Sequence, residues 1–219
     1  MNRRHLLRQG LVSTAVLVTL PRLGQAQNAC AKGKTPPQVK GPFYPVVDQL
    51  DKDADLIHVE GNTQAATGNV VIVEGVVTNQ NCLPVSGVLV EIWQACHTGR
   101  YNHPSDPNTG VALDPNFQYW GKAVTDENGF YRFRTIIPGS YPADVGWDRP
   151  PHIHFKVARV GYKELITQMY FSGNVLNDKD KILQQLPKSE QAKLVVSFQE
   201  IESQPHPVGR FDIQIEKIM

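Results

Sequence analysis

The chain has 219 residues, which is enough for one domain with a substantial buried core. Its 22 Lys and Arg residues nearly balance its 21 Asp and Glu residues, so the formal net charge is +1 and the composition does not favour a nucleic acid or an anionic membrane as partner. The sequence contains no internal repeat or low-complexity tract, so we expect one globular domain with processing segments.

Residues 1–26 have the features of an export signal. The pair Arg3 and Arg4 precedes an apolar stretch at 11–20, which is about half as long as a membrane span needs. This length favours a cleaved leader over a retained membrane anchor. Paired arginines are typical of the twin-arginine route, which exports folded proteins across the bacterial inner membrane. We therefore expect a periplasmic or secreted protein that begins near Gln27 and has no membrane association after processing. Loss of the four leader arginines lowers its net charge by four, to about −3.

Three cysteines remain after this cut, at positions 30, 82 and 96. An odd number in an oxidising compartment predicts one disulfide and one free thiol. Cys82 and Cys96 should lie near opposite ends of one strand, so we do not expect them to pair with each other. The spacing of the three matches no zinc-binding pattern.

The elements expected after the leader are mostly strands. Residues 27–69 are rich in Pro, Gly, Gln and Asp, which predicts an extended arm and loops. Strands are expected at 70–77, 88–93, 122–125, 130–135, 153–157, 165–171, 194–198 and 211–216. A long loop at 94–120 and one short helix at about 179–186 separate some of them. Many short strands with frequent turn signals predict an all-β domain over 70–219, either a sandwich or a barrel.

The sharpest local signal is the segment PPHIHF, at 150–155. Residues two apart in a strand face the same side, so His152 and His154 should point into one space. This pattern occurs at zinc, copper and iron sites, and also in histidines that only form hydrogen bonds. A zinc site would need a third His, Cys or carboxylate, and an Fe(II) facial triad would need a carboxylate. Asp144 and Asp148 are close enough in sequence to supply one, so spacing alone leaves the metal open.

Two tyrosines lie in loops, where side chains often serve function rather than packing. Tyr101 is in TGRYNH, at the start of the long loop, and Tyr141 is in PGSYP, just after an expected strand. Either tyrosine alone is as easily explained as an amphipathic packing residue. A phenolate is a hard anionic oxygen donor, so two phenolates with two imidazoles favour Fe(III) over Fe(II) or zinc, provided that all four converge.

The stretch from Trp93 to Phe171 closely resembles the intradiol ring-cleavage dioxygenases, and within that family most of all the iron-bearing β subunits of protocatechuate 3,4-dioxygenases. The matching segments are, in order, WQACHTGRYNHPSD, LDPNF, TDENGFYRFRTIIPGSYP, DRPPHIHF and LITQMYF. With GPFYP upstream, the resemblance covers most of residues 41–172. It implies a β-sandwich with long active-site loops. It also implies that O2 is used to open a catechol-type ring, such as protocatechuate, between its two hydroxyls, giving a muconate-type diacid.

The resemblance also implies roles for individual residues. The implied Fe(III) ligands are Tyr101, Tyr141, His152 and His154. Tyr141 would in addition take a proton from the diol. Arg149 falls on the family's active-site arginine, which can stabilise negative charge on the ring; the sequence alone would favour a surface ion pair, for example with Asp148. Gln168 falls on the family's active-site glutamine, although a strand glutamine can also serve only backbone groups.

Assembly and substrate stay open at this level. Catechol-cleaving relatives carry a helical N-terminal dimerisation segment for which this chain has no room, and protocatechuate enzymes pair the iron subunit with an iron-free homologous subunit. We therefore expect a homo-oligomer or such a hetero-oligomer. The bulky residues at 117–120 could reshape the pocket, and Cys96, His97 and His103 are expected to support Tyr101. Two other functions remain possible: a transthyretin-like β-sandwich binding module with an inactive metal site, and a zinc-dependent hydrolase built on the two histidines and an acid.

Overall fold

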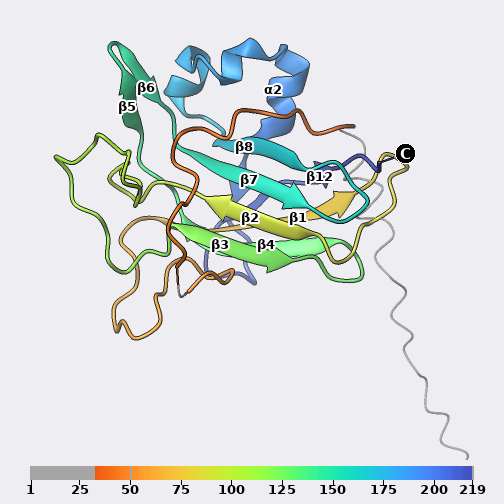
Figure 1. Ribbon diagram of the computed structural model, residues 1–219, viewed down its shortest axis with the longest axis horizontal. Helices are drawn as coiled ribbons and strands as arrows, with labels where there is room; N and C mark the ends of the chain where they lie inside the picture. Colours follow the sequence, from red (N-terminus) through yellow and green to blue (C-terminus); the bar gives the residue numbers. More distant parts are fainter. Residues whose placement is uncertain (1–32, 50, 219) are drawn as a thin grey trace, which may run out of the picture.

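Figure 1 shows the protein, as a computed structural model, to be two packed β-sheets with long loops at one end. The structure describes residues 33–49 and 51–218; the expected leader at 1–26 and Cys30 lie outside the described residues. Strands dominate the described part and the few helices are short, so the predicted all-β fold is confirmed. No helix in this part of the chain is long and apolar enough to cross a membrane.

The first sheet is organised around β1, Val70–Thr78. Its β-branched residues suit a central strand that packs on both sides. β1 pairs antiparallel with β4 (Phe130–Ile136) and, on its other edge, parallel with β11 (Val208–Arg210) and β12 (Ile213–Gln214). The short strand β10 (Phe198–Gln199) extends this sheet beyond β11.

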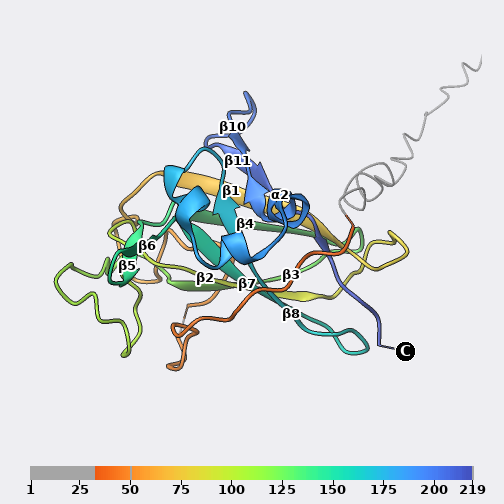
Figure 2. The same ribbon diagram turned by 90° about the horizontal axis from the view of Figure 1, so that it is seen from above.

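The second sheet carries the residues of functional interest. Its strands, in spatial order, are β3 (Trp120–Val124), β2 (Leu89–Trp93), β7 (His152–Ala158), β8 (Leu165–Phe171) and β9 (Val195–Val196). The first four pair antiparallel, and β9 joins β8 in parallel. Viewed from above in Figure 2, this sheet forms one layer and the sheet of β1 and β11 forms the other.

The hydrophobic core lies between these layers. Val90 and Ile92 of β2 are fully buried in it, against residues such as Phe133 of β4 and Phe155 of β7. Trp93, the next residue after Ile92, belongs instead to a second apolar cluster on the opposite face of the sheet. Both faces of β2 are therefore covered, which explains why its sequence is apolar at nearly every position.

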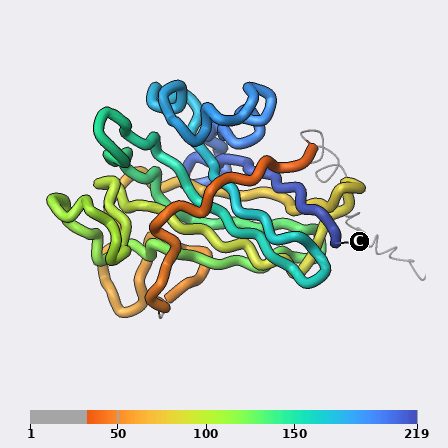
Figure 3. The backbone as a smooth tube through the Cα atoms, turned by 45° about the horizontal axis from the view of Figure 1, so that its top comes forward, coloured from red at the N-terminus to blue at the C-terminus, as the bar shows by residue number. Residues whose placement is uncertain are grey.

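The arm at 33–49 covers that outer face, crossing β8, β7 and β2 as the red and orange segment of Figures 1 and 3. The backbone N–H of Gln38 donates to the carbonyl of Ile166 at 2.9 Å. Further along, the hydroxyl of Tyr44 donates to Glu91 at 2.8 Å, and its ring packs edge-on against Trp93. The arm is thus fixed to the second sheet, although it forms no strand itself.

A hairpin that the sequence analysis did not predict projects from the end of the sandwich. It consists of β5 (Tyr141–Asp144) and β6 (Trp147–Arg149), joined by a turn in which Gly146 has a positive φ of 69°. Its residues are largely exposed, Val145 by 96%, so they show no apolar alternation. The hairpin pairs Tyr141 with Arg149 and so places the two side by side.

The helix expected at about 179–186 is wrong in position and type. The structure has the 3-10 turns η1 (Val175–Lys179) and η2 (Leu183–Gln185), followed by the α-helix α2 (Lys188–Leu194). Asp180 interrupts the expected helix, because its backbone is extended and its carboxylate accepts the N–H groups of Ile182 and Leu183. Pro187 then precedes α2, where a missing N–H does no harm.

The C-terminal strands are also shorter than expected. The strand predicted at 194–198 begins one residue later, because α2 continues to Leu194, and it is divided between β9 and β10. The strand predicted at 211–216 is reduced to β12, and β11 was not predicted. The cysteines agree with expectation: Cys82 takes part in a disulfide, whereas Cys96 is a free, buried thiol.

Candidate active site

Four buried side chains with metal-binding chemistry meet at one end of the second sheet. They are Tyr101, Tyr141, His152 and His154, each at most 8% exposed. The rings of the two histidines lie 4.9 Å apart between centroids, because alternate residues of β7 face the same side. The hydroxyl oxygen of Tyr101 is 3.3 Å from Nε2 of His152, and the two tyrosine rings are 5.6 Å apart between centroids.

Two glycines bring the tyrosines together. Gly99 precedes Tyr101 and Gly139 precedes Tyr141, and the two loops are packed backbone to backbone at these positions. A methyl group on Gly139 would overlap with the backbone nitrogen of Gly99 and the carbonyl oxygen of His97. Both glycine N–H groups also donate to the carbonyl of Cys96, at 3.0 and 2.9 Å. Only residues without a side chain permit this approach.

Gly139→Ala is therefore expected to separate the two loops. Forcing a methyl group into a packed contact destabilises a protein by about 1–3 kcal/mol. We expect a loss of this size in the free energy of unfolding, measured by urea titration, together with weaker metal retention. Gly110→Ala is the matched control, because a methyl group there meets nothing within 4 Å. Equal stability of the two variants would contradict this account of the loops.

The two histidines are held in place by their neighbours. Nδ1 of His152 lies 2.7 Å from the carbonyl of Pro150, so that nitrogen carries the proton and Nε2 is left as an acceptor facing Tyr101. His154 stacks on Trp93 with ring centroids 4.8 Å apart and planes 8° from parallel. Gly41 is also close to this ring, since a methyl group there would lie 3.2 Å from Cε1. These contacts fix both rings.

Burial controls the charge of all four groups. It lowers the pKa of His152 and His154 well below the usual range, so both imidazoles are neutral, which is the form that binds metals. It also raises the pKa of Tyr101 and Tyr141, because a buried phenolate loses its hydration, and the nearby charge of Arg149 only partly offsets this. A bound cation supplies a compensating charge and reverses the effect. The donor set thus fits a trivalent ion, which two phenolates help to neutralise.

The carboxylate that other metal sites would require is absent from this arrangement. Asp144 and Asp148 are exposed on the β5–β6 hairpin. Across residues 33–49 and 51–218, no three His, Cys, Asp or Glu side chains are grouped as a metal site. The zinc and Fe(II) ligand sets that the sequence left open therefore lack their third ligand in the described part of the chain.

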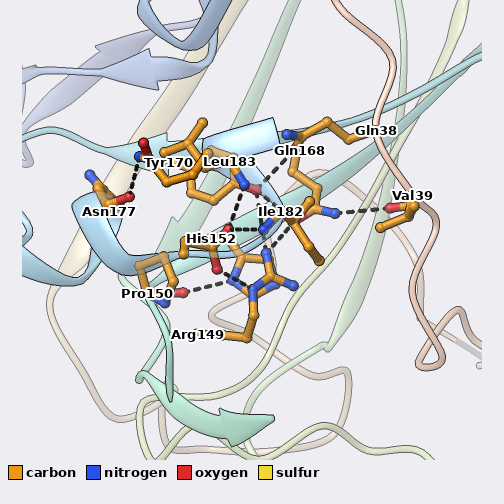
Figure 4. A network of polar contacts seen from close by, with 12 residues as sticks. Gln38, Val39, Arg149, Pro150, His152, Gln168, Tyr170, Asn177, Ile182 and Leu183 are labelled. Carbon is orange, nitrogen blue, oxygen red and sulfur yellow. Dashed lines mark hydrogen bonds and ion pairs between the residues drawn. The ribbon is translucent and has the colours of Figure 1, made fainter. Parts of the chain in front are cut away.

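Arg149 lies beside the four side chains and is 4% exposed, so it is not a surface residue. Its partner is not Asp148, as the sequence suggested, but Asp180: Nε donates to Oδ2 at 2.6 Å. Nη2 donates to Gln168 at 2.7 Å and to the hydroxyl of Tyr170 at 3.3 Å. Figure 4 shows this network next to His152.

Gln168 connects this network to the arm. Its Oε1 accepts from Arg149, and its Nε2 donates to the carbonyl of Val39 at 2.9 Å. The hydroxyl of Tyr170 donates in turn to Oε1 of Gln38, also at 2.9 Å. Both polar ends of the Gln168 amide are thus engaged, so its place in the structure is to hold Arg149 and the arm.

Sequence reasoning missed four residues that shape the site: Gln38, Trp93, Tyr170 and Asp180. Trp93 and Tyr170 lie inside segments that carried the family resemblance, so their closeness to the histidines could have been noted. Asp180 and Gln38 have no local signal, because they reach the site through contacts with residues far away in sequence. Of the loop residues, Cys96 contacts Thr98, His97 approaches Asp114, and His103 accepts the N–H of Ser105; none of them joins the four side chains.

Comparison with known proteins places the chain among dioxygenases. A family model described as "Dioxygenase" matches residues 39–216. The chain is 38% identical over 178 residues to the protocatechuate 3,4-dioxygenase beta chain of Burkholderia cepacia, covering 78% of this chain and 75% of that protein. It is 30% identical over 158 residues to catechol 1,2-dioxygenase 1 of Acinetobacter lwoffii, covering 66% of this chain and 49% of that protein. The chain thus spans about half the length of such catechol 1,2-dioxygenases.

Solved structures agree with this placement. The dioxygenase domain of a dioxygenase and carbohydrate-binding protein fusion from Streptomyces sp. SirexAA-E superposes with a TM-score of 0.62 at 27% identity, covering 84% of this chain and 99% of that one. The 3-chlorocatechol 1,2-dioxygenase of Rhodococcus opacus 1CP gives a TM-score of 0.66 at 24% identity, covering 88% and 77%, which supports the fold. Since the family model spans most of the chain and the Burkholderia relative is similar over three quarters of its own length, the chain belongs to the intradiol ring-cleavage dioxygenases.

Proposed function

We propose that the protein is an Fe(III)-dependent dioxygenase that inserts both atoms of O2 into a catechol-type diol, protocatechuate or a related compound, and yields a muconate-type diacid. The observation that carries this proposal is the convergence of two buried tyrosines and two buried neutral histidines on one space. When bound there, ferric iron would draw electron density from the diol and make its ring reactive toward O2.

The protein's own groups have separable tasks in this proposal. Tyr101, His152 and His154 hold the metal throughout, with both imidazoles fixed by their contacts. Tyr141, the most exposed of the four at 8%, is the ligand that accepts a proton from the diol at its hydroxyl oxygen. The guanidinium of Arg149 remains charged at any working pH and stabilises negative charge that develops on the ring.

Two measurements on the purified protein test this proposal. We expect about one iron per chain, with the burgundy-red colour of a ferric phenolate, since this donor set suits a hard trivalent ion. With catechol or protocatechuate we expect a diacid product that absorbs only in the ultraviolet. A yellow semialdehyde would mean cleavage outside the diol and would overturn the mechanism. Zinc in place of iron, or no turnover of any diol by the iron-loaded protein, would favour the hydrolase or the binding module.

We also propose that residues 1–26 direct export through the twin-arginine route. Support comes from the Arg3-Arg4 pair and the short apolar stretch behind it. Replacing both arginines by lysine is expected to keep the protein in the cytoplasm, which cell fractionation and immunoblotting would detect. Unchanged export of the Lys-Lys variant would contradict this assignment.

A further inference from the structure

The guanidinium of Arg149 is held directly by residues of two segments, and the N-terminal arm holds one of these segments in turn. Asp180, between η1 and η2, takes Nε, and Gln168 and Tyr170 of β8 take Nη2. The arm holds these two strand residues through the side chain of Gln38 and the backbone of Val39. Among the contacts of residues 33–49 and 51–218, Nη1 has no hydrogen-bond partner. Nη1 of the guanidinium therefore remains available to donate a hydrogen bond to a substrate.

The side chain of Asp180 is itself held in one orientation by its contacts. It is 0% exposed, and its two carboxylate oxygens have different partners. Oδ2 faces Arg149, whereas Oδ1 accepts the backbone N–H groups of Ile182 and Leu183 at 3.1 and 2.7 Å. The carboxylate thus cannot turn without losing backbone hydrogen bonds. The break in the expected helix at Asp180 is the local structure that makes this arrangement possible.

Stability alone does not account for such a pair. Removing both charges from water offsets much of the attraction between them, and buried ion pairs are often replaceable by apolar residues without loss of stability. A buried ion pair can instead fix the orientation of a side chain whose function depends on that orientation. Figure 4 shows Arg149 beside His152, and Asp180 binds this arginine through Nε.

We infer that Asp180 is a positioning residue: it orients Arg149 so that the free Nη1 is presented to the diol. The kinetic consequence rests on the proposed function, but the orientation of Arg149 does not. Without the Asp180 carboxylate, Gln168 and Tyr170 hold only Nη2, and the guanidinium can rotate about that contact. The guanidinium is then misplaced relative to the negative charge that develops on the diol ring.

Asp180→Asn is the variant for the test, because it keeps the size of the side chain and removes the charge. Two backbone N–H groups donate to Oδ1, so the amide oxygen should stay with them; the NH2 group then faces Nε of Arg149 and that contact is lost. Asp212→Asn is the matched control: Asp212 also accepts from an arginine Nε, that of Arg210 at 2.8 Å, and from a backbone N–H, that of Val76 at 2.9 Å. This second pair lies on the first sheet, away from the site.

The kinetic test is a double-mutant cycle with Arg149→Gln. Misplacing a group by about 1 Å can lower a rate by about 10²-fold, so we expect kcat for catechol to fall by up to that factor in Asp180→Asn. Iron content and colour should be retained. In the Arg149→Gln background, Asp180→Asn should change kcat by less than about twofold, since it has no arginine left to orient. If Asp180→Asn lowered kcat by the same factor in the Arg149→Gln background as in the wild type, Asp180 would not act through Arg149.

A second readout does not depend on turnover. In the full mature chain loaded with Ga(III), a diamagnetic stand-in for Fe(III), the Nε–H proton of Arg149 should exchange slowly with water. Asp180→Asn should make this exchange fast, and Asp212→Asn should leave it slow. Slow exchange in Asp180→Asn would overturn the proposal even if the wild type opened no diol.

Asp180→Glu is a second variant, for use if Asp180→Asn does not fold. It keeps the negative charge but displaces the carboxylate. It should fold, and it should show a loss of kcat that again disappears in the Arg149→Gln background. If neither variant at this position folds with metal bound, Asp180 is a structural residue and the positioning role is wrong.

Discussion

Replacing His154 by alanine is expected to remove iron, colour and turnover together, and His152→Ala should do the same. Each change deletes one of four donors from a buried site, and no neighbouring carboxylate in the described part of the chain can substitute. Changing even an outer partner of a metal ligand typically lowers metal affinity by about 10–100-fold, so deleting the ligand itself should lower it further. Iron content by mass spectrometry and the visible absorbance band measure this loss.

His58→Ala is the control for these two variants. His58 is exposed and lies outside the segments that carry the four candidate ligands, so its removal should leave the iron content unchanged. The fold of the ligand variants is checked by circular dichroism, because a loss of structure would also release iron. A folded His152→Ala or His154→Ala protein that keeps its full colour would show that this histidine is not a ligand.

The fold could be predicted where local sequence and tertiary environment agree. The β-branched run of β1 and the alternation along β2 and β7 produce strands close to their predicted bounds. The β5–β6 hairpin was missed because it is exposed and paired only with itself, so no apolar periodicity marks it. The helix was misplaced because Asp180 has an extended backbone and accepts the N–H groups of Ile182 and Leu183, which interrupts a segment with adequate helix propensity.

The site was predictable to a similar degree. Strand alternation alone places His152 and His154 on one face, and the structure has them there. The closeness of Tyr101 to Tyr141 could be predicted only from the family resemblance. It depends on two glycines, 40 residues apart, that pack backbone to backbone. The partner of Arg149 could not be predicted from either source. Proximity in sequence pointed to Asp148, whereas the fold brings in Asp180.

Arg149→Gln is expected to lower kcat strongly while leaving the metal in place. Arg149 contacts none of the four candidate ligands through a hydrogen bond, so iron content and colour should persist. Removing one preorganised group that stabilises transition-state charge typically lowers kcat by about 10²–10³-fold, or about 2.7–4 kcal/mol. Since the guanidinium meets charge that develops during the reaction, KM should change much less than kcat.

Arg149→Lys separates charge from geometry in this prediction. Lysine keeps the positive charge but has a single nitrogen, which cannot bind Asp180 and Gln168 and still present a free donor. If orientation matters, the lysine variant should be nearly as slow as the glutamine variant; if charge alone suffices, it should recover most of kcat. Steady-state rates with catechol, normalised to bound iron, decide between the two. A glutamine variant with wild-type kcat would remove Arg149 from the chemistry, and the buried pair with Asp180 would then serve the fold alone.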